Sequence, residues 1–167
     1  MNAEIIAIGH ELLMGEIVDT NTSFLAQELS KAGIPVRWSG VVSDNIADLN
    51  HAMSQAIERS DVIITTGGLG PTSDDLTREA VAAVLQEEMT VDPSLLEWLQ
   101  DVFVARGIEM PQTNIKQATL IPSAETIPNP QGTAPGWWAR KNNTHIILLP
   151  GPPRELKRIW AETVGPE

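Results

Sequence analysis

The sequence predicts an α/β domain built on a largely parallel sheet. The strand-like runs at 5–8 and 61–66 are nearly continuous in apolar or β-branched residues, which is typical of strands buried on both faces of a sheet. Segments with apolar residues at helical spacing separate such runs, and this alternation is the order of parallel βαβ units. A chain of 167 residues fits a single domain.

The first half of the chain is predicted to alternate strands with helices. The expected strands cover 3–9, 36–42 and 61–66, and the expected helices cover 20–32, 46–57 and about 76–86. Gly33 suits the position just after the first helix, and Pro35 prevents that helix from continuing. Asp44 precedes the second helix and is its predicted N-cap.

The second half departs from this rhythm. We predict a helical insertion over about 88–118 that covers one edge of the core, in which Asp92 caps a helix with Pro93 at its first position. The remaining expected elements are a strand over 119–121, a hairpin of 137–140 with 144–149 at the sheet edge, and a helix over 153–164.

The composition argues against several classes of protein. The absence of cysteine removes disulfides, thiolate metal sites and a cysteine nucleophile. Eleven basic against 22 acidic residues give a formal charge of −11, which disfavours nucleic acid as a partner. No apolar run approaches the roughly 18–20 residues of a membrane span, and no basic segment precedes the first apolar run as in a signal peptide. We therefore predict a cytoplasmic protein without membrane contact.

Three polar, glycine-rich loops follow predicted strands, at 9–21, 67–77 and 150–154. In an open α/β sheet, ligands bind outside the carboxyl ends of the strands. Glycine lets the backbone approach a ligand closely and turn its N–H groups toward it, and the start of the following helix favours a phosphate. The three loops together predict a site for a phosphate-bearing, nucleotide-like ligand.

The loop at 67–77 carries the strongest signal. Its paired glycines precede Asp74 and Asp75, which would repel a bare anion unless a divalent cation or a cationic group of the ligand lay between them. The structural alternative is that one aspartate only caps the following helix. The loop is not a Walker A motif, because no Gly-Lys-Ser/Thr sequence closes it.

The other two loops offer weaker candidates. One of Asp19, Thr20 and Asn21 is expected to cap the helix at 20–32, and Arg154 either clamps a phosphate or is a solvated surface residue. Covalent catalysis is disfavoured, because there is no glycine-flanked serine nucleophile and the histidines lack metal-ligand spacing.

In this order, the loops resemble the N-terminal domain of the competence/damage-inducible protein CinA, a branch of the molybdopterin-binding (MoaB/MogA-like) superfamily. The matching stretches are IGHELLMGEIVDTN, VVSDN, TTGGLGPTSDDLTREA, PQTNIKQA, NPQGTAPG and LLPGPPRELK, which together span nearly the whole chain. His10 stands where this family usually has threonine.

The resemblance implies a three-layer α/β/α sandwich with a mostly parallel sheet, MogA-like, in one domain over 1–167. It also implies a metal-dependent nucleotide pyrophosphatase that acts on ADP-ribose-like dinucleotides. The implied cofactor is a divalent metal ion, with a monovalent cation as a further candidate. In pterin-processing relatives, an aspartate at the position of Asp75 serves pterin adenylylation, and another aspartate near the position of Asp44 lies in the same pocket.

We assign expected roles on this basis. The expected catalytic residues are Asp75, Asp44 and Lys116, and the expected metal ligands are Asp75, Asp74 and Asp44. The expected ligand- and phosphate-binding residues are Gly67, Gly68, Leu69, Gly70, Thr72, Gly9, Asn21, Gly151 and Arg154.

Two other functions stay open. One is a non-catalytic module that binds a pterin or nucleotide, and the other is a molybdopterin adenylyltransferase. The second is disfavoured by Pro152, where those relatives place serine or asparagine, and by GGLG in place of GGTG. The resemblance also suggests a homo-oligomer, a dimer or trimer, for which the apolar edge near Trp137 and Trp138 is a candidate contact.

Overall fold

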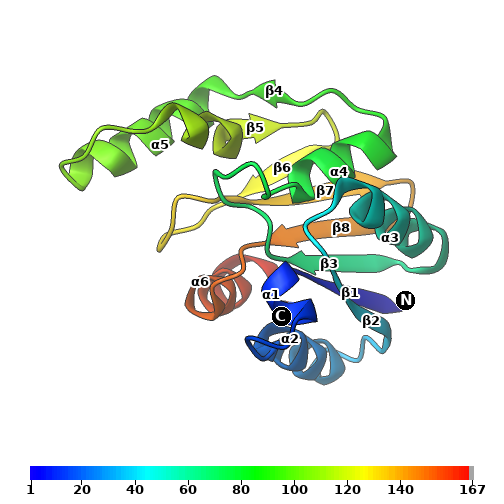
Figure 1. The fold of residues 1–167 in the computed structure, drawn as a ribbon. Coiled ribbons are helices and arrows are strands. Elements are labelled where there is room, and N and C mark those ends of the chain that lie inside the picture. The colour runs from blue at the N-terminus through cyan, green and yellow to red at the C-terminus, as the bar shows by residue number, and fades with distance from the viewer. Residues whose placement is uncertain (166–167) are drawn as a thin grey trace.

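The computed structural model describes residues 1–165 and contains a six-stranded sheet in the order β2-β1-β3-β8-β7-β6 (Figure 1). The first four strands of that order run parallel, and β7 and β6 are antiparallel to their neighbours. Their bounds are β1 Ala3–Ile8, β2 Val36–Val42, β3 Val62–Thr66, β6 Ala124–Ile127, β7 Gly136–Lys141 and β8 Thr144–Leu149. The predicted α/β class with a mostly parallel sheet is confirmed.

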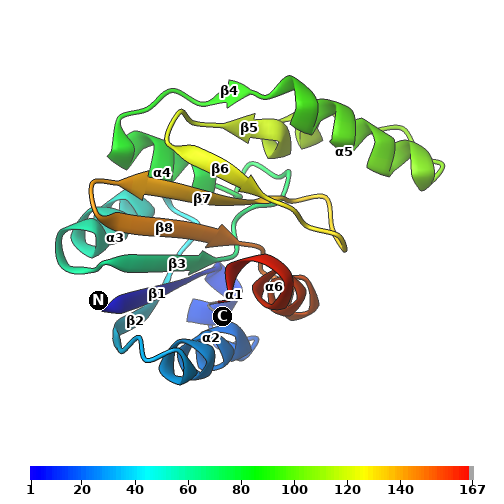
Figure 2. The same ribbon diagram turned by 180° about the vertical axis from the view of Figure 1, so that it is seen from behind.

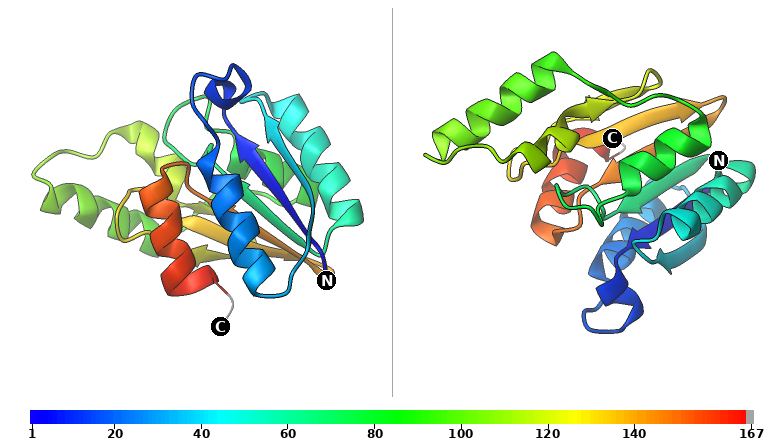
Figure 3. Two further views of the ribbon diagram at one scale, coloured as in Figure 1. Left: turned by 90° about the horizontal axis from the view of Figure 1, so that it is seen from below. Right: turned by 45° about the horizontal axis from the view of Figure 1, so that its top comes forward.

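Helices cover both faces of the sheet, so the domain has three layers (Figures 2 and 3). Helices α2 (Thr20–Lys31) and α6 (Pro153–Ile159, continued by a π-helical turn) lie on one face, and α3 (Ile46–Arg59) and α4 (Thr77–Leu85) lie on the other. Successive strand residues feed opposite layers, since Ile5 packs with the α2 side and Ile6 with the α3 side. Both faces are buried, which explains the continuous apolar run of β1.

The N-cap of α3 differs from the prediction. Asn45, not Asp44, caps this helix, because its side-chain oxygen accepts hydrogen bonds from the backbone N–H groups of Ala47 and Asp48. Asp44 is thereby free for another role. The predicted cap of α5 (Pro93–Ala105) is confirmed, since the carboxylate of Asp92 accepts from the N–H of Leu95.

The insertion is more than a pair of helices. A short strand β4 (Thr90–Val91) pairs antiparallel with β5 (Thr119–Leu120), and α5 and a 3-10 helix (Gln112–Ala118) lie between them in the chain. Leu99 and Phe103 of α5 form a small cluster of their own with Ala118. The insertion lies beyond β6 and thus adds a separate small unit at that edge of the sheet (Figures 1 and 2).

The predicted place of the hairpin is wrong. Strand β8 lies between β3 and β7, and β6, which the sequence patterns did not reveal, forms the edge. Trp137 is fully buried and its indole N–H donates to the Thr119 carbonyl at 3.0 Å. The Trp138 indole N–H donates to Nδ1 of His145 at 3.0 Å. Trp137 therefore cannot serve as the exposed contact between subunits that we expected.

None of the helices within residues 1–165 combines the length and the apolar character needed to cross a bilayer.

Candidate functional site

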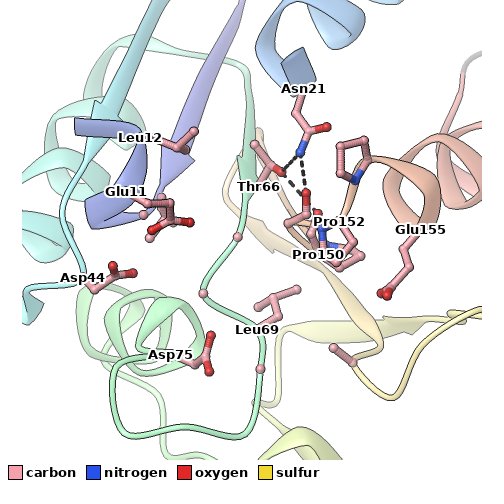
Figure 4. Close-up of a pocket in the computed structure, with 18 of the residues that line it drawn as sticks. Glu11, Leu12, Asn21, Asp44, Thr66, Leu69, Asp75, Pro150, Pro152 and Glu155 are labelled. Atoms are coloured by element: carbon pink, nitrogen blue, oxygen red, sulfur yellow. Dashed lines mark hydrogen bonds between the residues drawn. The ribbon is translucent and has the colours of Figure 1, made fainter. Parts of the chain in front are cut away.

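The three predicted loops meet around one cavity of about 620 Å³ at the carboxyl ends of β1, β3 and β8 (Figure 4). The first loop contributes Gly9, Glu11, Leu12 and 17–21, the second contributes 66–72 with Asp74 and Asp75, and the third contributes Pro150 to Pro153 with Glu155. Parallel strands bring their carboxyl ends to one edge, which is why segments far apart in the sequence share this cavity.

Three successive carbonyl groups of the second loop point into the protein. Thr77 Oγ1 donates to the Gly67 carbonyl at 2.8 Å, and the Thr77 N–H donates to the Gly68 carbonyl at 3.2 Å. The Leu69 carbonyl accepts from Nη1 of Arg78 at 2.9 Å. The three donor groups belong to Thr77 and Arg78 in the first turn of α4, so the start of this helix fixes the backbone of the loop.

The corresponding N–H groups face the other way. In a planar trans peptide the N–H points opposite to the C=O, so the N–H groups of Gly68, Leu69 and Gly70 are directed away from α4. Within residues 1–165 none of the three donates a hydrogen bond to another group of the protein. These residues line the cavity, and consecutive N–H groups that share one side of the chain form an anion-binding concavity.

The second loop requires glycine at positions 67 and 68. Gly67 and Gly68 have φ values of +104° and +68°, which favour a residue without a β-carbon. A β-carbon on Gly67 would also collide with the Ile8 carbonyl, and one on Gly68 would collide with Oγ1 of Thr77. The backbone shape and the close packing therefore both exclude side chains here.

Asp75 closes the second loop instead of capping α4. Its Oδ2 accepts hydrogen bonds from the Thr72 N–H at 2.9 Å and from the Thr72 hydroxyl at 2.5 Å. Leu76 occupies the N-cap position, where no side chain bonds to the helix. The alternative that one aspartate of this loop only caps the helix is therefore wrong.

Asp44 also lines the cavity, and it lies on the same side of the Leu69 backbone as Asp75 (Figure 4). Its Oδ2 accepts from the His10 N–H at 2.8 Å, which fixes the carboxylate relative to the first loop. His10 thus contributes its backbone rather than its imidazole. The oxygen Oδ1 of Asp44 and that of Asp75 accept no hydrogen bond from any group within residues 1–165.

The cavity is strongly acidic. Its lining includes the carboxylates of Glu11, Asp19, Asp44, Asp74, Asp75 and Glu155. No lysine, arginine or histidine lines it in the part of the chain that the structure describes. Such a cavity favours a cation, or a ligand that brings one with it.

The predicted trio of metal ligands is not a preassembled centre. Across residues 1–165, no three His, Asp or Glu side chains gather closely enough to hold a metal ion. Asp44 and Asp75 can each still offer one carboxylate oxygen. Mg²⁺ commonly takes one or two protein carboxylates and completes its shell with water and substrate phosphates. The residues present therefore fit an ion shared with a ligand, and they do not fit a closed protein site.

Lys116 and Arg154 lie elsewhere than predicted. The ammonium of Lys116 donates to the carbonyls of Thr72 and Asp75 at 2.9 and 2.5 Å, so it supports the second loop from outside the cavity. It also pairs with Glu79 at 3.1 Å. Arg154 is exposed and does not line the cavity. Spacing alone could not reveal that neither cation lines the cavity.

Asn21 joins the three loops. Its Nδ2 donates to Thr66 Oγ1 and to the Gly151 carbonyl, both at 2.8 Å. The Thr66 hydroxyl donates in turn to the Pro150 carbonyl at 3.2 Å. Asn21 is only 8% exposed, so this side chain holds the loops in register more than it offers itself to a ligand.

Sequence reasoning missed Thr77 and Arg78. Arg78 is 1% exposed, and burial lowers the pKa of its guanidinium to about 10, while Glu79 and Asp75 act to raise it. It therefore stays charged at neutral pH. The only signal was a helix start directly after a glycine loop, and an arginine there is usually a solvated surface residue.

The family follows from comparison with known proteins. A model of the family described as "Probable molybdopterin binding domain" matches residues 4–167. The chain belongs to this family. A crystal structure of the protein CinA from Thermoplasma acidophilum is 34% identical, covers 96% of this chain and 94% of its own, and superposes with a TM-score of 0.90. The chain thus belongs to the CinA branch of the family.

A curated relative supports the same assignment to the CinA branch. A CinA-like protein from Deinococcus radiodurans is 52% identical over 98% of this chain and 42% of its own length. This CinA-type chain therefore spans about two fifths of the length of that relative. The molybdopterin biosynthesis enzyme MoaB from Thermus thermophilus shares the fold, with a TM-score of 0.64 at 21% identity over 95% of this chain and 86% of its own. The MogA-like fold that the motifs predicted is confirmed.

Proposed function

We propose that this CinA-type domain hydrolyses the diphosphate bond of ADP-ribose-like dinucleotides that enter as complexes with a divalent cation. The observation that carries the proposal is the row of three unengaged N–H groups at Gly68, Leu69 and Gly70, with Asp44 and Asp75 lining the same cavity. The N–H groups suit phosphate oxygens, and the carboxylates suit the cation that those oxygens carry.

The acidity of the cavity explains why the cation is needed. Six carboxylates line the cavity, and among residues 1–165 no lysine, arginine or histidine does, so the cavity would repel a free diphosphate. A shared divalent ion removes this conflict. When bound, such an ion neutralises charge on the phosphate oxygens and lowers the pKa of a coordinated water. The cavity volume of about 620 Å³ is within the range of small-molecule and cofactor sites.

The residues of this chain would position the reacting groups. The N–H groups of the second loop hold the diphosphate, and Asp75, fixed by two hydrogen bonds from Thr72, presents Oδ1 to the attacking water. Water adds to one phosphorus, the bridging P–O bond breaks, and the products of ADP-ribose are AMP and ribose 5-phosphate. Phosphoryl transfer depends mainly on positioning and charge, so the proposed reaction requires no covalent intermediate on a side chain of the cavity.

A non-catalytic binding module is the second candidate. It is favoured by one feature of the cavity, which offers no lysine or arginine to a departing phosphate within the described residues. Adenylyl transfer to a pterin is less well supported, because Pro152 lines the cavity where the relatives that carry out that reaction place a hydrogen-bonding side chain.

The test is release of AMP from ADP-ribose with Mg²⁺, Mn²⁺ or Co²⁺, compared with a chelated sample. Asp75→Asn keeps the volume and removes the charge, so we expect turnover to fall by about 100-fold or more. Asp101→Asn, on the exposed side of α5, is the matched control and should act like the wild type. Metal-dependent turnover that survives in Asp75→Asn would reject the assignment. Tight binding of ADP-ribose without turnover under every metal would favour the binding module.

A further inference from the structure

Arg78 is a buried cation without an acidic hydrogen-bonding partner. Its Nη1 donates to the Leu69 carbonyl at 2.9 Å and its Nη2 to the Pro135 carbonyl at 2.8 Å. The guanidinium lies over the ring of Trp137, with 5.8 Å between Cζ and the ring centroid. Within residues 1–165 no carboxylate pairs with it at ion-pair distance, and its Nε has no hydrogen-bond acceptor.

Such an arrangement costs stability. A buried charge is usually paired with an opposite charge, and a guanidinium held only by neutral carbonyls retains much of its desolvation penalty. Glu4 shows the ordinary solution in the same chain, because its buried carboxylate accepts two hydrogen bonds from the exposed guanidinium of Arg59, at 3.0 and 2.6 Å. Asp75 and Glu79 act on the charge of Arg78 without bonding to it, so the anion of a ligand beside the loop would add countercharge that residues 1–165 do not bring into contact with the guanidinium.

The position of Arg78 identifies that anion. The guanidinium donates to the carbonyl of the Leu69–Gly70 peptide, whose N–H belongs to the row, and both residues of that peptide line the cavity. We infer that Arg78 is the positioning residue and the buried countercharge of the diphosphate site. It holds the Leu69 carbonyl inward, so that the Gly70 N–H faces the ligand, and its charge acts on the ligand through the peptide. This inference rests on the proposed function, since it assumes that phosphate binds at this row.

The two effects of Arg78 can be separated. Gln117 Nε2 also donates to the Leu69 carbonyl, at 3.3 Å, and it is neutral. When Arg78 is replaced, the carbonyl keeps one donor, so the loop keeps part of its shape while the charge is lost. An effect of charge should therefore appear as weaker binding of anions and not as weaker binding of neutral ligands.

The experiment is calorimetric titration of the full chain with methylenediphosphonate in excess Mg²⁺, and with adenosine as a neutral probe. Arg78→Gln should weaken diphosphonate binding by about 20-fold, as expected for loss of a charge-assisted contact. Arg78→Lys keeps the charge but cannot make both hydrogen bonds of the planar guanidinium, and we expect diphosphonate affinity to fall by about fivefold. Adenosine affinity should stay within about twofold in both variants, because the neutral probe does not sense the charge. Arg59→Gln removes an exposed arginine that is paired with the buried carboxylate of Glu4, so it is the control for loss of a structural arginine and should bind diphosphonate like the wild type.

Each outcome decides something. Diphosphonate binding within about twofold of wild type in Arg78→Gln would overturn the role of Arg78 while leaving the hydrolase proposal intact. Absence of diphosphonate binding by the wild type would overturn both proposals. A selective loss in Arg78→Gln in a protein that releases no AMP would support the role of Arg78 and overturn only hydrolysis.

A second pair of variants covers the case in which Arg78→Gln does not fold. Thr77→Val removes the hydroxyl that holds the Gly67 carbonyl, and Thr77→Ser retains it. Diphosphonate affinity should fall by about fivefold in the valine variant and stay near wild type in the serine variant. Equal affinity in both would overturn the claim that the first turn of α4 sets the N–H row.

Discussion

The two loops that form opposite sides of the cavity are built differently. The loop at 67–77 is held by α4 and by Lys116 of the 3-10 helix, and Leu69 is buried. The loop at 9–18 carries the four-residue helix α1 (His10–Leu13), which has no buried residue. Its apolar side chains are exposed, including Met14 at 62% and Val18 at 83%.

The hydrogen bonds of the two loops show the same contrast. Most backbone hydrogen bonds of 9–18 are local, such as Met14 N–H to the His10 carbonyl, whereas the second loop bonds to groups on other elements. Segments with few buried contacts open at low free energy. The difference indicates that the side at 67–77 is preformed. If the proposed function holds, the side at 9–18 is the part that would adapt to the group attached to the diphosphate.

Glycine-to-alanine substitutions should separate the two sides most strongly. Gly68 and Gly15 have nearly the same φ, +68° and +72°, but a β-carbon would collide with Thr77 only at Gly68. Gly68→Ala should abolish measurable diphosphonate binding, a loss of about 100-fold, because the N–H row must shift. Gly15→Ala should cost about 1 kcal/mol of unfolding free energy from its backbone alone and leave binding unchanged. Urea denaturation and calorimetry measure the two effects, and equal binding losses would contradict the difference between the loops.

Asn21→Asp tests the junction between the loops. Aspartate has the shape of asparagine but donates no hydrogen bond, and it would place a negative charge beside the Gly151 carbonyl. We expect a loss of about 2 kcal/mol in unfolding free energy and about tenfold weaker diphosphonate binding. Asn143→Asp, in the β7–β8 turn, is the control. Unchanged stability in Asn21→Asp would mean that Asn21 does not hold the loops together.

Lys116→Met should affect the second loop only. The variant removes the ammonium from the carbonyls of Thr72 and Asp75 and leaves Glu79 unpaired. We predict an approximately fivefold fall in AMP release, and we expect most of it in kcat and little in KM. The variant removes the hydrogen bonds that hold the backbone of Asp75 in place, but it removes no contact with the ligand. Lys31→Met, on the exposed end of α2, is the matched control. A loss of several hundredfold would instead favour the direct role that the sequence first suggested.

Arg154→Ala should have the smallest effect. Its side chain is exposed and lies outside the cavity lining, so ADP-ribose turnover and diphosphonate affinity should stay within about twofold of wild type. A tenfold loss of diphosphonate affinity in Arg154→Ala at low salt would show that this arginine contacts the ligand.

Much of the fold was predictable because local rules and tertiary structure agree. The continuous apolar runs predicted β1 and β3, and Asp92 with Pro93 predicted the start of α5. Strand β6 was missed because its segment, Ala-Glu-Thr-Ile, is too short to show a period. The cap of α3 was misplaced by one residue because Asp44 and Asn45 are both good N-caps and only the His10 N–H decides between them.

The candidate site was predictable in its loops but not in its hydrogen bonds. Glycine-rich segments after parallel strands must meet at one edge, so the cavity followed from topology. Whether a cation faces the cavity depends on side-chain direction, which spacing does not determine. Lys116, Arg154 and Arg78 were therefore misjudged or overlooked.

The N–H row at Gly68, Leu69 and Gly70 is the feature on which the account depends, and it can be observed directly by NMR. Titration of the ¹⁵N-labelled chain with methylenediphosphonate and Mg²⁺ should move these three amide signals more than any others, with small changes over 9–18. Displacement of other amides while these three stay unchanged would contradict the account, because the phosphate would then bind elsewhere.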